Sequence, residues 1–218
     1  MKAVFFDSID NTQDYALENF EQEPLLVVSY FQETGRGTDN RDWENADQAL
    51  ACSLVFNEVP QSFTTTLIPL ISGFSYLEVV GNSDLKLKWP NDILLNNAKV
   101  GGILVEKKDS KICIGMGINY FWENPEVPNA SSLYSEKLDR QILNDHAQKW
   151  AELTLSTIHE NSFDISSYKK KLTTLGKLIE YPEGRGWARD VNVDGSLAVE
   201  TITGEMINLT SPLISEVK

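Results

Sequence analysis

The segment Leu85–Glu106, LKLKWPNDILLNNAKVGGILVE, is the stretch from which the fold can be inferred. Apolar residues and lysines alternate over residues 85–89. Side chains in a strand point alternately to opposite faces, so the lysines share one face and the apolar residues share the other. The segment is too hydrophobic for a surface loop, yet it carries three lysines, an Asn-Asp pair and a double glycine. These polar residues and glycines need an explanation beyond packing.

The polar part of this segment has the composition of an anion site. Pro90 keeps Trp89 extended and ends regular pairing, so Asn91 and Asp92 follow at a strand end or bulge. The glycines at 101–102 let a backbone or a ligand approach closely. Two lysines and an acid beside bare backbone suit an anionic ligand or a metal-bound phosphate, and these residues are Lys88, Lys99 and Asp92. The alternative is an amphipathic strand with a glycine turn, and the segment alone slightly favours that alternative.

Length and composition set outer limits on fold and function. The chain has 218 residues, 41% hydrophobic and 23% charged, which suffices for one sizeable core and a small appendage. Neither a membrane-spanning run nor an export signal is present in the sequence, so we expect a cytoplasmic protein that does not bind membranes. The net charge of −13 argues against nucleic acid as a partner, although local cations could still bind a nucleotide.

Neither the two cysteines nor the two histidines are expected to take part in catalysis or metal binding. Cys52 and Cys113 lie in apolar, strand-like runs and are expected to be buried free thiols. His146 and His159 lie in a helical region far from every motif, so we expect packing or surface roles for them.

Periodicity predicts an α+β chain. Strands are expected over residues 3–7, 24–31 and 49–56, with three or four more within 85–120, and helices over 11–20, 61–81, 132–160 and 165–176. After Gly176 the sequence breaks into short alternating runs, and Asp194-Gly195 is a strong hairpin signal. We therefore predict a main domain over residues 1–175 and a small β-barrel domain over 176–218.

Two further segments favour a ligand site. Residues 32–48, QETGRGTDNRDWENADQ, form a long loop of the kind that is usually functional or disordered. The tripeptide Gly35-Arg36-Gly37, with Arg41 and Trp43 after it, combines flexible backbone, guanidinium donors and an aromatic ring that could exclude water. The polar string at residues 8–16 is compatible with helix capping alone, and capping can coexist with binding.

Together these motifs resemble the biotin protein ligase family. The resemblance rests on KWPNDILLNNAKVGGILVE, ETGRGTDNRDW, IDNTQDYA and IGMGIN, which follow the family's order and spacing from residue 7 to about residue 120. It implies a mixed central sheet flanked by helices, followed by a small C-terminal SH3-like β-barrel. It also implies a two-step reaction: biotin and ATP form biotinyl-5′-AMP and pyrophosphate, and a lysine of a biotin carboxyl carrier protein then displaces AMP.

The resemblance assigns roles to residues of this chain. Catalysis is assigned to Lys99, Lys88, Asp92 and Arg36. Biotin binding is assigned to Asn11, Thr12, Gln32, Gly35, Arg36, Gly37, Lys99, Gly102 and Gly115. ATP or adenylate binding is assigned to Arg36, Arg41, Trp43, Lys88, Asn91 and Asn119, with Trp122 as a weaker candidate. The protein is not expected to bind a metal directly; Mg²⁺ would come with ATP and lie near Asp92.

The chain also departs from the family pattern. Thr38, Asp39 and Asn40 stand where many members have an arginine or glutamine and a further glycine. We expect either leaky release of biotinyl-AMP or compensation by Arg41. Because the first predicted strand begins at the start of the sequence, we expect a ligase without the DNA-binding domain of the repressor members. An exposed edge strand would allow two copies to pair.

Three alternatives remain open from the sequence. The first is a lipoate or octanoate ligase or transferase, against which the Lys-Trp-Pro-Asn-Asp string argues. The second is a non-catalytic paralogue that holds biotin or its adenylate, which the altered loop would permit. The third is an interaction protein that works through its C-terminal β-domain.

Overall fold

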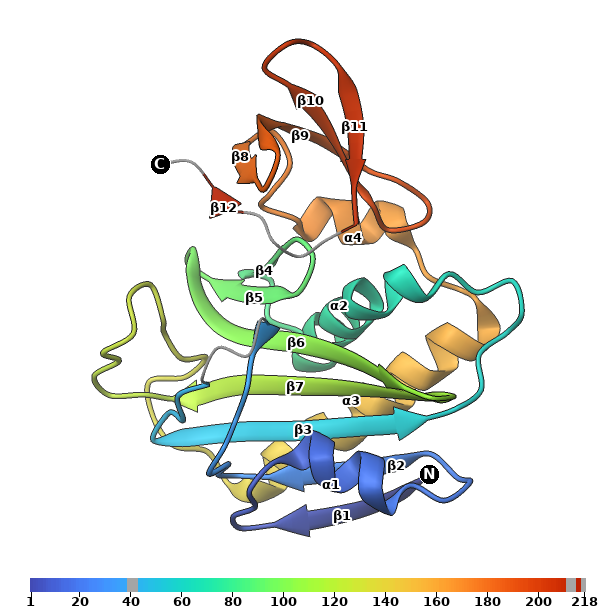
Figure 1. Cartoon of the computed structure of the whole chain (residues 1–218). Coiled ribbons are helices and arrows are strands. Elements are labelled where there is room, and N and C mark those ends of the chain that lie inside the picture. The colour runs from blue at the N-terminus through green and yellow to red at the C-terminus, as the bar shows by residue number, and fades with distance from the viewer. Residues whose placement is uncertain (39–42, 211–214, 217–218) are drawn as a thin grey trace.

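A seven-stranded mixed sheet forms the body of the protein in a computed structural model, which describes residues 1–38, 43–210 and 215–216 (Figure 1). The first two strands are parallel and every other neighbouring pair in the sheet is antiparallel. In spatial order the strands are β1 (Lys2–Phe6), β2 (Leu25–Ser29), β3 (Gln48–Phe56), β7 (Lys111–Phe121), β6 (Ala98–Lys108), β5 (Asp92–Leu95) and β4 (Leu85–Lys88). The predicted mixed sheet flanked by helices is confirmed.

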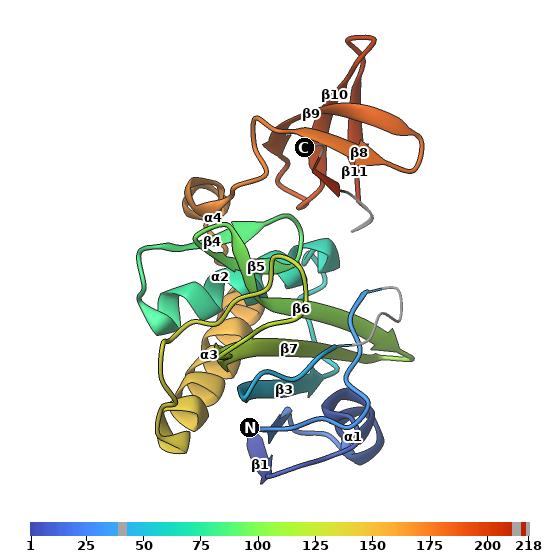
Figure 2. The same cartoon turned by 90° about the vertical axis from the view of Figure 1, so that its left-hand side faces the viewer.

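Helices cover both faces of this sheet (Figures 1 and 2). One face carries α1 (Thr12–Asn19), and the other carries α2 (Ile68–Val80), which follows a 3₁₀ turn (Thr65–Leu67), and α3 (Arg140–Glu160). Strand β2 is therefore buried on both sides: Leu26 and Val28 join the core under α2 and α3, whereas Leu25 and Val27 pack with α1. Double burial explains its unbroken apolar sequence.

The central segment folds as its alternation predicted. Leu85, Leu87 and Trp89 are buried, whereas Lys86 and Lys88 are half-buried. Because the same segment continues through β5 and β6, the lysines come to lie on a face that is shared by three neighbouring strands.

The predicted helix over residues 132–160 is too long at its start. Residues before α3 instead pair with β7: the backbone N–H groups of Leu133 and Tyr134 donate to the carbonyls of Asn119 and Tyr120. The helix starts only after this connection has passed the end of β7, and the Asp139 side chain caps it by accepting a hydrogen bond from the N–H of Gln141.

The C-terminal segment forms a second, antiparallel sheet. Its order is β11 (Met206–Leu209), β10 (Leu197–Thr201), β9 (Gly184–Val191), β8 (Leu178–Tyr181) and β12 (Ser215–Glu216). The hairpin predicted at Asp194-Gly195 is confirmed between β9 and β10. This small antiparallel sheet is consistent with the predicted SH3-like domain, but β11 and β12 stand at opposite edges of it, so the described strands do not close into a barrel. The division between residues 175 and 176 stays a prediction.

The two sheets are joined through α4 (Ile165–Lys171) and through Trp89. Helix α4 ends before the predicted residue 176, because the next residues turn back to β4 and Thr173 donates to the carbonyl of Leu87. The backbone N–H of Trp89 donates to Thr174 and its indole N–H donates to the carbonyl of Gly195, each over 2.9 Å. The buried side chains of both sheets form one continuous apolar cluster.

The two cysteines are buried, and the two histidines pack against aromatic side chains. Cys52 and Cys113 are both buried and free, as predicted. His146 packs against two buried tyrosines and His159 packs edge-on against Phe56, which confirms packing roles. Within the described ranges, helices with the length and apolar character needed to cross a membrane are absent.

Candidate functional site

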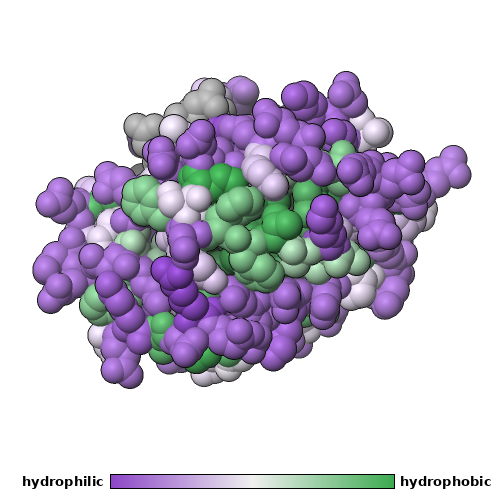
Figure 3. Space-filling view, turned by 90° about the horizontal axis from the view of Figure 1, so that it is seen from below, coloured by the Kyte–Doolittle hydropathy of each residue, from purple (hydrophilic) through white to green (hydrophobic). Residues whose placement is uncertain are grey.

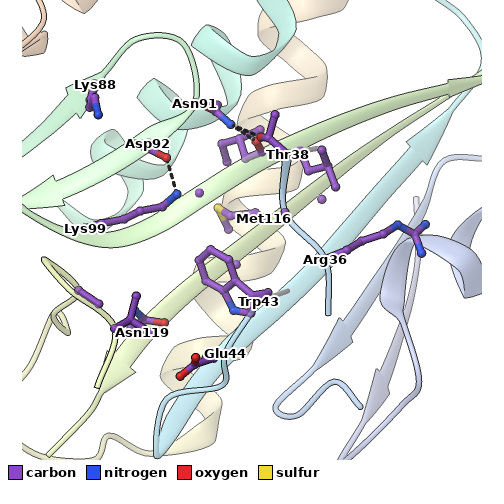
Figure 4. Close-up of a pocket in the computed structure, with 18 of the residues that line it drawn as sticks. Arg36, Thr38, Trp43, Glu44, Lys88, Asn91, Asp92, Lys99, Met116 and Asn119 are labelled. Atoms are coloured by element: carbon purple, nitrogen blue, oxygen red, sulfur yellow. Dashed lines mark hydrogen bonds and ion pairs between the residues drawn. The ribbon is translucent and has the colours of Figure 1, made fainter. Parts of the chain in front are cut away.

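A cavity of about 950 Å³ lies over β6 and β7, between the loop after β2 and the start of the C-terminal sheet (Figure 4). Thirteen of the sequence-predicted site residues line it, namely Asn11, Thr12, Gln32, Arg36, Gly37, Trp43, Lys88, Asn91, Asp92, Lys99, Gly102, Gly115 and Asn119. Residues more than 100 positions apart in the chain therefore meet around one space.

The cationic part of the cavity comes from three adjacent strands. Lys88 on β4 faces Asp92 across the β4–β5 pair, and Asp92 forms a 2.5 Å ion pair with Lys99 on β6. Figure 4 shows Lys99 pointing toward Asp92, with Lys88 on the neighbouring strand. Because Asp92 is 21% exposed and Lys99 is 41% exposed, the pair is open to an anion that enters the cavity.

Trp43 lies across a floor that lacks side chains. A Cβ at Gly117 would lie 2.9 Å from two carbons of the Trp43 ring, so only glycine lets the indole approach the sheet this closely. The Lys99 ammonium is 5.8 Å from the centre of the same ring, within the range of a cation–π interaction. The indole thus covers the floor next to the lysine-acid pair.

The other end of the cavity is a buried network of neutral polar groups. Gln32 Oε1 accepts hydrogen bonds from the backbone N–H of Thr12, over 2.8 Å, and from its hydroxyl, over 2.9 Å. Ser53 donates to the Thr12 hydroxyl over 2.8 Å. Asn11 caps α1 by accepting from the backbone N–H groups of Gln13 and Asp14, and its amide donates to the carbonyl of Thr34. Capping and cavity lining therefore coexist at Asn11.

Arg36 has partners that sequence reasoning missed. Its guanidinium donates to both carboxylate oxygens of Asp14, over 2.8 and 2.6 Å, and to Glu106 over 3.3 Å. This hydrogen bonding holds the pKa of Asp14 below its usual value. Figure 4 shows the Arg36 side chain extending away from Lys99 and Asp92.

Gln13 lines the cavity as well, although the sequence analysis did not name it as a site residue. Its amide nitrogen donates to Glu106 over 2.8 Å, so it belongs to the same network as Arg36. A Cβ at Gly115 would lie 2.7 Å from its Cδ, so Gly115 makes room for this side chain. An amide packed on a glycine strand leaves no signal in a single sequence, because its partner lies more than ninety residues away.

Two asparagines have distinct environments. Asn91 Nδ2 donates to the hydroxyl of Thr38 and to the carbonyl of Ile103, each over 3.0 Å, so it joins the loop to β6. Asn119 Nδ2 donates to the carbonyl of Ser131 over 3.0 Å. Asn119 lines the cavity, and its Oδ1 is buried and has no hydrogen-bond partner among the described residues.

Two predicted residues do not join the described lining. Gly35 is a buried residue of the loop, and its backbone carbonyl accepts a hydrogen bond from the backbone N–H of Trp43. Arg41 lies outside the described residues, together with Asp39 and Asn40. The cavity also gains lining residues that the motifs did not indicate, and these include Lys177, Cys52, Met116 and residues 127–130; Trp122, the weaker candidate, lines it as well.

Metal binding by the protein alone has little support in the described ranges. Clusters of three or more histidine, cysteine, aspartate or glutamate side chains are absent from them. Asp92 lines the cavity and is already paired with Lys99. A divalent cation would need most of its ligands from a bound phosphate chain.

Taken together, the site offers two kinds of recognition at once. One end presents uncharged donors and acceptors in a buried setting, as a compact neutral polar group requires. The other end presents ammonium groups beside bare backbone, as phosphate or carboxylate requires. A glycine floor and an indole between them leave room for an elongated ligand that has a neutral head and an anionic tail.

Comparisons with known proteins agree with this geometry. The sequence profile of the biotin/lipoate A/B protein ligase family matches residues 5–119. The bifunctional ligase/repressor BirA of Bacillus spizizenii is 31% identical over 163 residues, which cover 66% of this chain and 50% of that protein. The chain thus spans about half the length of this curated relative. The biotin–[acetyl-CoA-carboxylase] ligase of Mycobacterium tuberculosis is 28% identical over 195 residues, which cover 81% and 73% of the two chains.

A solved structure matches over the whole chain. The biotin protein ligase from Aquifex aeolicus in complex with biotin and ATP superposes with a TM-score of 0.84 and 26% sequence identity, and the match covers 100% of this chain and 99% of that one.

Proposed function

This chain belongs to the biotin/lipoate A/B protein ligase family, and on that premise we propose that it is an ATP-dependent biotin–protein ligase. The observation that carries the proposal is the convergence of Lys88, Asp92 and Lys99 with a buried neutral polar network around one cavity. The Aquifex aeolicus protein of the same fold holds biotin and ATP, which supports both ligands here.

The first step joins two anions. An oxygen of the biotin carboxylate attacks the α-phosphorus of ATP, and the bond to the bridging oxygen breaks with release of pyrophosphate. Lys99 is placed to offset the charge that the carboxylate and the α-phosphate bring together, and Lys88 to offset that of the departing phosphates. Mg²⁺ bound to the phosphates of ATP would supply further neutralisation, and Asp92 is the carboxylate of the lysine cluster that could help to hold it.

The second step transfers the acyl group. The neutral amine of a carrier lysine attacks the carbonyl carbon of biotinyl-AMP, the bond to the phosphate oxygen breaks, and AMP leaves. The amine loses one proton, for which the Asp92 carboxylate is the nearest acceptor on this side of the cavity. Trp43 lies over the glycine floor, where it would keep water from the reactive anhydride.

The neutral end of the cavity favours biotin over lipoate. The biotin ureido ring has two N–H donors and one carbonyl acceptor, and Asn11, Thr12 and Gln32 line this end with amide and hydroxyl groups of both kinds. The dithiolane ring of lipoate has no comparable donors or acceptors, so it could not exchange hydrogen bonds with this network. The buried Oδ1 of Asn119 is suited to accept from the exocyclic amine of adenine.

Partners follow from the same proposal. The acceptor is a biotin carboxyl carrier domain, and the net charge of −13 makes nucleic acid an unfavourable partner. The buried free thiols agree with a place in the cytoplasm.

A homodimer is the second part of the partner proposal. Strand β1 is an edge of the seven-stranded sheet, and Phe5 on it is 41% exposed. Figure 3 shows apolar side chains gathered on the side where β1, β2 and α1 lie. A second copy could extend the sheet along β1, which sedimentation equilibrium would detect as a doubled mass.

Exchange of labelled pyrophosphate into ATP tests the function. We expect exchange that depends on biotin, and transfer of biotin to a carrier domain when one is added. Exchange supported by lipoate or octanoate instead of biotin would favour the related ligases. Biotin binding without any exchange would favour a non-catalytic paralogue.

A further inference from the structure

Arg36 sits in a network whose charge does not suit an anion. The guanidinium uses both terminal nitrogens on Asp14 and shares one of them with Glu106. One positive and two negative charges leave the trio with a net charge of −1, so it offers no net attraction to a carboxylate or phosphate. Turning the guanidinium toward a ligand would also strip two carboxylates of their partner. The terminal nitrogens of the Arg36 guanidinium are therefore already bonded to Asp14 and Glu106.

The same network joins three segments that are distant in sequence. Asp14 belongs to α1 and Glu106 belongs to β6, whereas Arg36 belongs to the loop after β2. Glu106 is itself held by Gln13, which donates to the same carboxylate oxygen that Arg36 contacts. A planar guanidinium with a two-bond contact to one acid fixes direction as well as distance.

Further contacts hold the loop on both sides of Arg36. Before it, the backbone N–H of Thr34 and its carbonyl bond to Asp10 and Asn11. After it, the hydroxyl of Thr38 accepts from Asn91. Between these two anchors lies Gly37, which has no side chain, so it is backbone that this residue presents to the cavity.

We propose that Arg36 is a positioning residue: with Asp14 and Glu106 it clamps the loop to α1 and β6, and the loop backbone at Gly37 thereby faces the ligand. The guanidinium itself does not contact the substrate. This assigns Asp14 and Glu106 a part in biotin binding although neither lines the cavity. The inference rests on the proposed function for the identity of the ligand, and it replaces the transition-state role that the family resemblance suggested for the Arg36 side chain.

A double-mutant cycle on biotin affinity separates a clamp from a direct contact. Calorimetry would measure the dissociation constant for biotin in Arg36→Met, Asp14→Asn and the double variant. For a clamp, each single variant weakens binding by about fivefold to tenfold, and the double variant is no weaker than Arg36→Met, because both changes remove the same contact. Arg36→Lys should restore part of the loss, since it keeps one ion pair.

Matched controls and a second readout keep the test decisive. Glu18→Gln removes a negative charge one turn further along α1 and should leave affinity unchanged. Hydrogen exchange of residues 33–38 in the ligand-free protein should rise equally in Arg36→Met and Asp14→Asn, whatever the ligand proves to be.

Two other outcomes have separate meanings. If Asp14→Asn changes neither affinity nor exchange while Arg36→Met weakens binding, the guanidinium contacts the ligand and the clamp is overturned. If the wild type binds no biotin but the exchange results appear as expected, the clamp stands and the proposed function falls.

Discussion

The ammonium group of Lys99 on β6 lies 2.5 Å from a carboxylate oxygen of Asp92 on β5. The two residues are seven positions apart in the sequence, and a tight turn brings their strands together. Asp92 therefore compensates the positive charge of Lys99.

Removal of Lys99 should abolish most of the activation step. Lys99→Ala is expected to lower biotin-dependent ATP–pyrophosphate exchange by about a hundredfold to a thousandfold, because the charge that builds up in the transition state loses its partner. Lys86→Ala is the matched control, since Lys86 lies on β4 of the same sheet and is not among the residues that line the cavity. Exchange above a tenth of the wild-type rate in Lys99→Ala would contradict a catalytic role.

Asn119 should act on the nucleotide rather than on biotin. Asn119→Ala removes the buried acceptor Oδ1, and we expect the KM for ATP to rise roughly tenfold, as for the loss of one buried hydrogen bond to a ligand. Biotin affinity measured without ATP serves as the internal control and should be unchanged. An equal loss for both ligands would mean that the variant disturbs β7 as a whole.

The loop that contains Thr38 should hold biotinyl-AMP less tightly than the corresponding loop of a relative with arginine at that position. Thr38 stands where the family resemblance implies an arginine or glutamine in many members, and its hydroxyl accepts from Asn91. We expect labelled biotinyl-AMP to leave this protein faster than it leaves a relative with arginine at that position, as measured by rapid filtration. Equal retention would show that the loss is compensated, for which Arg41, outside the described residues, is the candidate.

Trp89 should link the stability of the two sheets. Trp89→Phe keeps an aromatic ring but removes the indole N–H that donates to the carbonyl of Gly195. Because Trp89 is only 3% exposed, the loss should lower the free energy of unfolding by about 1–3 kcal/mol. Urea denaturation would measure it, with Trp187→Phe on an exposed face as the control. Separate unfolding transitions in Trp89→Phe, absent from the wild type, would identify the contact as the coupling element.

Mild acid should destabilise the fold through His146. Burial lowers its pKa below the ordinary value, helped by Lys149 and opposed by Asp145. Its Nδ1 lies 2.7 Å from the hydroxyl of Tyr120, which in turn accepts from Tyr76. The unfolded chain therefore binds a proton at a higher pH than the folded chain does.

The sign of the pH effect follows from that difference. Stability should fall as the pH drops below about 6.5, the usual imidazole value, and should level off below the lowered pKa of the folded state. His146→Gln removes the titrating group and should flatten this part of the profile. Thermal melts between neutral pH and pH 5 would measure both proteins, and identical slopes would exclude His146 as the cause.

Local patterns predicted most of the fold, and the motifs named many of the residues that line the cavity. The alternation over residues 85–89 determined which side chains are buried, because a strand has a period of two in any context. The polar string at residues 8–16 predicted a capped helix start, and the structure has α1 beginning at Thr12 with Asn11 as its cap. The extent of α3 and the open C-terminal sheet were not predictable, because both depend on pairing with strands that lie elsewhere in the chain.

What the sequence by itself determined is the set of residue types brought to the site: two lysines, an acid, a Gly-Arg-Gly loop and a polar helix start. Only the tertiary structure decided which of them face one another. It joined Lys99 to Asp92, and it directed the Arg36 guanidinium away from that pair toward Asp14 and Glu106. The physical reason is that electrostatic and hydrogen-bond partners are chosen by distance in space, and the direction of a long side chain depends on charges that folding brings from α1 and β6.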